Sequence, residues 1–122
     1  MKFTELEEQE IIKRSGLVPE FVPAEVLAGV KQRYLEPHRH YHTWDHALNF
    51  LAWITKVSEE SPLFEGQRHR GLSGKIAALF HDVIYDIHRG APWNEEQSAI
   101  LMIEQLGNLE GENEVSKRLI LA

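Results

Sequence analysis

The chain has 122 residues, of which 43% are hydrophobic and 26% are charged, and these proportions favour one globular domain over disorder or a fibrous repeat. Because it contains no cysteine, disulfides and thiolate zinc sites are excluded, and any transition metal must be held by imidazole and carboxylate groups. The formal net charge of -6 argues against a general nucleic-acid binder, since affinity for the phosphate backbone depends on clustered Lys and Arg.

Two helices are predicted at the start of the chain. Thr4 followed by Glu7 has the form of a capping box, which would start a first helix that runs to Gly16. Its acidic sequence predicts a solvated helix. Pro23 suits the first turn of a second helix, because a missing N–H is harmless there, and apolar residues recur at helical spacing until Pro37.

A third helix is predicted after a histidine-rich segment. Thr43 or Asp45 could cap it, and its apolar positions continue to about Val57. Ser61-Pro62 would end it. Residues 62–74 include three glycines and several charges, which predicts an exposed connection.

The apolar run Ile76 to Phe80 predicts a fourth helix, which His81-Asp82 follows directly. Residues 90–92, Gly-Ala-Pro, break the chain again. Asn94 would then cap a fifth helix with Glu95 in its first turn, where a carboxylate suits the positive end of the helix dipole.

The last predicted elements are a polar turn over residues 107–113 and a helix over residues 115–122. We find no internal repeat and no low-complexity segment in the sequence. Residues 1–122 are therefore predicted to form a single all-α domain.

Four of the seven histidines lie between residues 38 and 46. Two of them, His42 and His46, are four residues apart, so on a helix their side chains would share one face. Imidazole is the commonest metal ligand, but solvated and capping histidines are also common. This pair alone leaves both interpretations open.

The doublet His81-Asp82 adds a second signal. It follows an apolar run, and an ionised carboxylate in an apolar interior is unstable unless it is paired or bound to a metal. Asp82 therefore indicates a specific partner, and a metal is a natural one. The alternative is that Asp82 accepts hydrogen bonds from His46 or from backbone N–H groups without a metal.

Three segments resemble a known family. They are Glu36 to Thr43, Phe80 to Asp86, and Asn94 to Ala99. The sequence resembles the HD superfamily of metal-dependent phosphohydrolases, whose pattern is a His, a His-Asp doublet and a distant Asp, and it is similar to a group of bacterial predicted HD phosphohydrolases. Residues 41–47 also resemble the corresponding stretch of the cyclic-nucleotide phosphodiesterases. The resemblance implies an HD-domain-like helical bundle.

The resemblance also implies roles for four residues. His46, His81 and Asp82 would bind a divalent metal ion, which could be Mn, Fe, Zn, Mg or Ni, and Asp82 would be catalytic as well. His42 matches the histidine that protonates the leaving alkoxide. These roles are chemically consistent, because a divalent ion lowers the pKa of bound water towards about 7. An imidazole with an ordinary pKa of about 6.5 can act as general acid beside it.

Six further residues are candidates for substrate binding: His38, Arg39, His40, Tyr85, Asn94 and Glu95. A solvated loop is an equally open interpretation of the first three. For Asn94, a role as helix N-cap is the alternative to substrate binding.

The sequence departs from the family pattern at the closing Asp. The only aspartates are Asp45, Asp82 and Asp86, so none lies far beyond the doublet. We therefore expect the front part of a longer domain, truncated at its C-terminus. The alternatives are that a carboxylate such as Asp86, Glu95 or Glu96 substitutes, or that a second chain completes the site.

The sequence thus predicts a metal-dependent phosphohydrolase that hydrolyses a phosphate ester or a nucleotide with a metal-activated water. The alternative is a truncated, catalytically weak HD-like domain that binds metal, nucleotide or its own copy. A plain helical domain with fortuitous histidines is a third interpretation. Apolar faces left exposed on the last two elements would favour a homo-oligomer.

The expected location is the cytoplasm. The lack of cysteine fits a reducing compartment, and residues 1–10 are acidic where a signal peptide would be basic and then apolar. The longest apolar runs fall far short of the roughly 20 residues that a membrane-spanning helix needs. We therefore expect neither a membrane nor a nucleic acid as partner.

Overall fold

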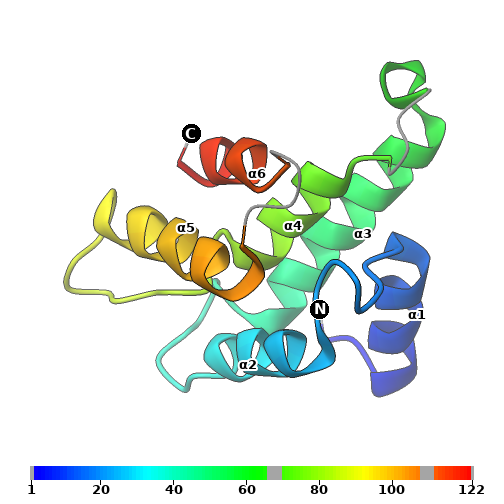
Figure 1. Cartoon of the computed structure of the whole chain (residues 1–122). Coiled ribbons are helices and arrows are strands. Elements are labelled where there is room, and N and C mark those ends of the chain that lie inside the picture. Colours follow the sequence, from blue (N-terminus) through cyan, green and yellow to red (C-terminus); the bar gives the residue numbers. More distant parts are fainter. Residues whose placement is uncertain (1, 66–69, 108–111, 122) are drawn as a thin grey trace.

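The computed structural model describes residues 2–65, 70–107 and 112–121, with the backbone alone for residues 112–116. Every regular element in these ranges is helical (Figure 1). In chain order the elements are α1 (Glu5–Ser15), α2 (Ala24–Tyr34), α3 (Trp44–Glu60), the short 3-10 helix η1 (Pro62–Phe64), α4 (Leu72–Phe80), α5 (Trp93–Leu106) and α6 (Glu112–Leu121). The prediction of an all-α fold is confirmed for this part of the chain.

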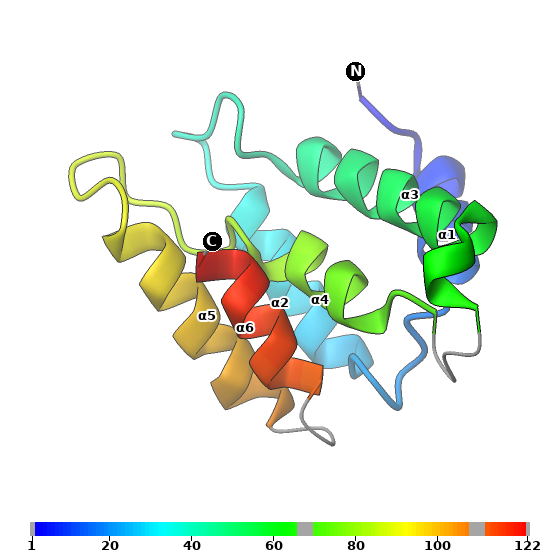
Figure 2. The same cartoon turned by 90° about the horizontal axis from the view of Figure 1, so that it is seen from above.

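Helix α4 lies at the centre of the bundle. All of its residues are buried except Ser73 and Gly74. Helices α3 and α6 pack against it from different sides, and α1 and α5 pack in turn on α3 and α6 (Figure 2). Helix α2 adds Val26, Val30 and Tyr34 to the same core. The residues at the end of α4 therefore lie among several other helices.

The ends of α1 follow from its sequence. Thr4 and Glu7 make both hydrogen bonds of the capping box, and Gly16, with a φ of 74°, ends the helix in the left-handed conformation. The prediction of a solvated helix was wrong for one face, because Ile11 and Ile12 pack against the core.

Helix α4 begins earlier than the sequence pattern indicated, at Leu72 rather than Ile76. Gly71, with a φ of 69°, allows the turn that precedes it. A Cβ at Gly74 would lie 3.4 Å from Ile54 Cγ2, so α3 and α4 approach closely there. These two glycines therefore start α4 and pack it against α3, instead of belonging to an exposed connection.

The remaining boundaries also differ from the prediction. Helix α5 begins at Trp93, one residue before Asn94, and α6 begins at Glu112. The predicted polar turn falls partly on residues 108–111, which lie outside the described residues. Within the described ranges, no helix has the length and apolar character that crossing a bilayer requires.

Candidate metal centre

Two histidines and an aspartate meet where α3 begins and α4 ends. His46 lies in the first turn of α3, and His81 and Asp82 directly follow α4. One nitrogen of each imidazole and one oxygen of the carboxylate lie within 4.8 Å of one another. The packing of α3 on α4 therefore brings together the three residues for which metal binding was expected.

His81 is oriented by the end of α4. Its backbone N–H still donates to the Ala77 carbonyl, which continues the helical hydrogen-bond pattern. Its imidazole Nδ1 lies 2.9 Å from the Ala78 carbonyl oxygen, so Nδ1–H donates there. The other nitrogen, Nε2, lies 3.0 Å from Asp82 Oδ2. A backbone hydrogen bond of this kind fixes the ring and presents the opposite nitrogen as a ligand atom.

Asp82 is held through both its backbone and its carboxylate. Its N–H donates to the Tyr34 hydroxyl at 3.2 Å, and that hydroxyl donates to the Leu79 carbonyl at 2.8 Å. His42 Nδ1 donates to Asp82 Oδ2 at 2.8 Å. Burial raises the pKa of Asp82, but hydrogen bonds and charge from His81 and His42 outweigh burial and lower this pKa to about 2. The carboxylate is therefore ionised at neutral pH.

The two expected histidine ligands differ in pKa. Burial lowers the pKa of His81, but the hydrogen bond and negative charge of Asp82 outweigh burial and raise it above its ordinary value. Burial, followed by the positive charge of His81, lowers the pKa of His46. The His46 imidazole is therefore neutral near pH 7 and can bind a cation, whereas a proton on His81 competes with a cation.

His42 lies beside this cluster but not on α3. Thr43 caps the helix by accepting a hydrogen bond from the His46 N–H at 3.3 Å, so His42 belongs to the preceding loop. His42 and His46 therefore do not lie on one helix, which is the condition under which their spacing would place both side chains on one face. The loop nevertheless brings His42 to Asp82, and among the described residues none hydrogen-bonds its Nε2.

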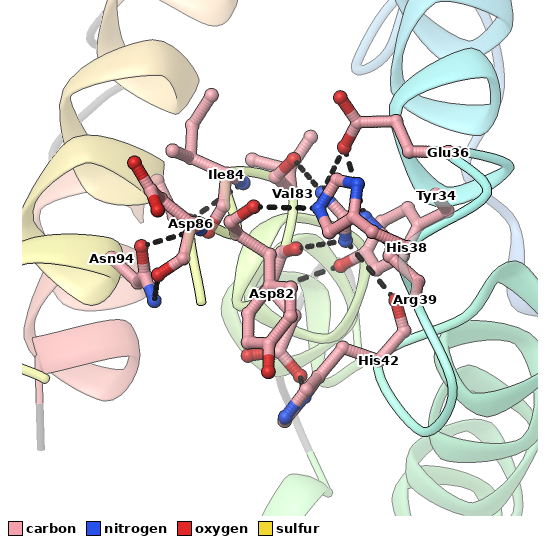
Figure 3. A network of polar contacts seen from close by, with 12 residues as sticks. Tyr34, Glu36, His38, Arg39, His42, Asp82, Val83, Ile84, Asp86 and Asn94 are labelled. Atoms are coloured by element: carbon pink, nitrogen blue, oxygen red, sulfur yellow. Dashed lines mark hydrogen bonds and ion pairs between the residues drawn. The ribbon is translucent and has the colours of Figure 1, made fainter. Parts of the chain in front are cut away.

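Arg39 holds the doublet from the side of α2 (Figure 3). Its guanidinium is fully buried and donates to the Glu36 carboxylate and to the backbone carbonyls of His42, Asp82 and Val83. These bonds occupy all five N–H donors of the side chain. The geometry contradicts the expectation that Arg39 binds substrate, because it leaves no donor for one.

Helix α5 holds the loop after the doublet from the opposite side (Figure 3). The Asn94 side chain accepts from the Asp86 N–H at 2.9 Å and donates to the Asp86 carbonyl at 3.1 Å. Ser98 Oγ likewise bonds the N–H and the carbonyl of Ile84. Asn94 lies inside α5, which begins at Trp93, so the expectation that it is the N-cap is corrected. It is 8% exposed and therefore not open to substrate, which corrects the expectation of substrate binding.

The other expected substrate contacts are spread around the site. His38 is exposed, its Nε2 lies 3.0 Å from the Tyr85 carbonyl oxygen, and the two rings are stacked. The Tyr85 ring also lies 4.5 Å from the His42 ring, measured between centroids. His40 and His46 line a separate hollow of about 260 Å³. Tyr85 therefore lies between His38 and His42, with a ring contact to each, whereas His40 lines the same hollow as His46.

A larger cavity of about 700 Å³ adjoins the doublet. His81 and Asp82 form part of its wall, and apolar side chains from α3, α4 and α6 form most of the rest. Glu95 and Glu96 line it from the first turn of α5. One Glu95 oxygen, Oε2, is buried without a hydrogen-bond partner among the described residues.

The described residues bring together three candidate ligands and no fourth. Asp86, Glu95 and Glu96 do not join the cluster of His46, His81 and Asp82. Asp86 instead accepts a hydrogen bond from a backbone N–H of its own loop. The substitution of one of these carboxylates for the closing Asp is therefore not seen in this geometry.

The donor set fits a divalent ion. Two imidazole nitrogens and a carboxylate oxygen suit ions such as zinc, manganese and iron. Three protein ligands leave positions open for water and substrate. No protein-family model matches the chain, and no match was found among the curated proteins or the solved structures. The cluster of His46, His81 and Asp82 is therefore the basis for the function proposed below.

Proposed function

We propose that this chain is a metal-dependent phosphohydrolase with an HD-like helical bundle, acting on a phosphate ester or a nucleotide. The observation that supports it most is that Asp82 Oδ2 lies within 3.0 Å of both His81 Nε2 and His42 Nδ1. The Asp82 carboxylate, a proposed metal ligand, thus contacts both His81, a second proposed ligand, and His42, the proposed proton donor. The resemblance of the three sequence segments to the HD superfamily points the same way.

His46, His81 and Asp82 would hold the ion. When bound, a divalent ion supplies Lewis-acid chemistry, because it neutralises charge on phosphoryl oxygens and acidifies water. The protein keeps its ligands in place before the ion arrives: Ala78 orients His81, while Tyr34 and the buried Arg39 fix the backbone of Asp82. Such support around metal ligands increases both affinity and activity.

His42 would donate the proton to the leaving group. The Asp82 carboxylate accepts the hydrogen bond from Nδ1, which fixes the orientation of the ring. The opposite nitrogen, Nε2, has no hydrogen-bond partner among the described residues and is available to donate to an alkoxide oxygen. The nearby Tyr85 ring restricts the rotation of His42. These contacts suit a general acid.

Phosphate release tests the proposal. A panel of phosphate monoesters, diesters and nucleotides is incubated with the protein and Mn²⁺, Fe²⁺, Zn²⁺, Mg²⁺ or Ni²⁺. We expect the wild type to hydrolyse at least one ester, and His81→Ala and Asp82→Asn to hydrolyse none. His88→Ala is the matched control, because His88 is an exposed histidine outside the cluster. Equal activity of all four proteins would contradict the proposal.

Metal-dependent binding without turnover is a second candidate function. It is favoured by the candidate set of three ligands among the described residues and by the exposure of His46, since both would weaken the binding of an ion. The same panel separates the two functions. A binding module would retain ions and ligands in equilibrium measurements but would release no phosphate from any ester.

A further inference from the structure

We propose that a small tetrahedral oxyanion, such as inorganic phosphate, binds in a hollow at the opposite end of α4 from the metal centre, where Lys75 and Arg70 hold it. The hollow has a volume of about 130 Å³ and lies between the end of α1 and the beginning of α4. Its described lining residues are Ser15, Gly16, Phe21, Arg70, Leu72 and Lys75. The inference goes beyond the proposed function, because none of these residues belongs to the metal centre.

Lys75 is a buried cation without a hydrogen-bond partner. The residue is 8% exposed, and its ammonium donates no hydrogen bond to any described residue. Lysine is almost never buried to this extent unless it is paired. Burial lowers the pKa of the Lys75 ammonium, and the negative charge of Glu59 offsets only part of this effect. The ammonium therefore lacks a full counter-charge, which a bound anion would supply.

The Lys75 ammonium can be reached from the hollow. A buried lysine ordinarily covers its methylene stem and keeps its nitrogen in contact with water. The Lys75 Nζ, unlike the Arg70 Nε, is not sealed from solvent. Because Lys75 lines the hollow, an anion inside it can replace water at this nitrogen. An anion there would form a charge-assisted hydrogen bond, which is stronger than a neutral one.

Arg70 brings a second positive charge to the same hollow. Its Nη2 donates a hydrogen bond to the Ser61 carbonyl oxygen at 3.3 Å, which fixes the side chain. Its Nη1 makes no hydrogen bond within the described ranges and is not sealed from solvent. Arginine and lysine are the side chains with which proteins commonly bind phosphate. The two cations can therefore donate to one oxyanion.

The start of α4 adds to the positive potential of the hollow. The first-turn N–H groups of a helix have no partner within the helix and form the positive end of its dipole. No side chain caps α4 at Gly71. None of the described lining residues is acidic. Glu59, whose charge acts on Lys75, lies outside the lining and pairs with Arg14 at 3.2 Å. These charges favour an anion.

The volume of the hollow favours a small ion. About 130 Å³ holds roughly four water molecules at about 30 Å³ each, which is close to the size of an ion with four oxygens. Sites for larger organic ligands usually have about 300 Å³ or more. A free phosphate or sulfate therefore fits the hollow better than a nucleotide does.

Calorimetric titration of sodium phosphate into metal-free protein tests the inference. EDTA removes divalent ions, and sodium chloride keeps the ionic strength constant. We expect wild type to bind one phosphate ion and Lys75→Met to bind it at least about tenfold more weakly, since a charge-assisted hydrogen bond is lost. Lys56→Met is the matched control, because Lys56 is exposed on α3 and does not line the hollow. Its affinity should equal that of wild type.

Two further measurements keep the test decisive. Urea denaturation should show that Lys75→Met is as stable as wild type, because replacing an unpaired buried charge by an apolar side chain is often neutral or stabilising. Crystals of wild type grown with selenate, an oxyanion of the same shape, should give an anomalous peak between Lys75 and Arg70.

Three outcomes would overturn the inference. They are the absence of phosphate binding to wild type, equal affinities of wild type and Lys75→Met, and a selenate peak that lies only outside the hollow. Because the titration contains no divalent ion and no phosphate ester, each of these outcomes leaves the phosphohydrolase proposal untouched.

Discussion

His42 Nδ1 lies 2.8 Å from Asp82 Oδ2, although the two residues are 40 positions apart in the sequence. The same oxygen lies 3.0 Å from His81 Nε2. A residue expected to donate a proton and a residue expected to bind a metal therefore share one carboxylate. A change at either one should alter the other, and substitutions can separate their roles.

Replacing His42 by Asn separates proton transfer from hydrogen bonding. The Asn amide can still donate to Asp82 Oδ2, but it cannot protonate a leaving group. We expect kcat for an alkyl phosphate to fall by about 10²–10⁴-fold, with Mn²⁺ affinity nearly unchanged.

A leaving group that needs no protonation provides the control for this variant. Hydrolysis of 4-nitrophenyl phosphate by His42→Asn should fall far less than hydrolysis of the alkyl ester, and steady-state kinetics measure both. Equal losses on the two esters would show that His42 acts only through the position of Asp82.

Replacing Tyr34 by Phe should weaken the fold around the doublet. The Tyr34 hydroxyl bonds both the Leu79 carbonyl and the Asp82 N–H, so its removal leaves two buried backbone groups without that partner. We expect the free energy of unfolding to fall by about 1–3 kcal/mol, as measured by urea denaturation. Tyr41→Phe is the control, because Tyr41 is 83% exposed. Equal stability of both variants would contradict this role of Tyr34.

Replacing Arg39 by Lys tests whether Arg39 supports the structure or binds phosphate. A single ammonium cannot reach the four groups that the guanidinium contacts, so stability should fall by about 2–4 kcal/mol. Urea denaturation and substrate KM are measured on the same preparation. A variant with wild-type stability and a strongly raised KM would restore Arg39 as a substrate-binding residue.

Local patterns in the sequence were sufficient for the helices, whereas the cluster was expected from the resemblance to the HD superfamily. Helical spacing and the Thr4 capping box predicted α1 to α5 to within a few residues, since both signals depend on neighbouring positions. The apolar run before His81-Asp82 predicted that the doublet would lie at the end of a buried helix. Polar side chains at such a position need specific partners. The histidine-rich segment alone did not single out His46, which was selected by the resemblance to the HD superfamily.

The supporting contacts could not be predicted in this way. Tyr34 and Arg39 bond backbone groups more than 40 positions away, and no sequence pattern specifies a backbone partner. Asn94 followed by glutamates has the pattern of an N-cap, but α5 begins one residue earlier and turns Asn94 towards the loop of Asp86. The sequence left the cap of α3 open between Thr43 and Asp45, and the structure has Thr43 as the cap, so His42 lies in the preceding loop.

Metal affinity should rise with pH. The pKa of His81 is raised above its ordinary value, so a proton occupies this ligand in the metal-free protein below that raised pKa. From about pH 5 upwards, loss of this proton should strengthen Mn²⁺ binding by up to about tenfold per pH unit, until His81 is neutral. His46, with its lowered pKa, loses its proton at a lower pH than His81.

The proton released on metal binding can be measured directly. Calorimetric titration near pH 6 in two buffers with different ionisation enthalpies should show that close to one proton leaves per ion bound. Affinity that does not change between pH 5 and pH 8, with no proton release, would contradict the assignment of His81 as a ligand.

The central claim is that His46, His81 and Asp82 bind one divalent ion. Anomalous diffraction at the manganese edge tests it most directly, with crystals of wild type, His81→Ala and the control His88→Ala grown with Mn²⁺ and without chelator. We predict an anomalous peak between the three side chains in wild type and in His88→Ala, and none in His81→Ala. Manganese absent from these side chains in wild type, or still bound there in His81→Ala, would contradict the claim.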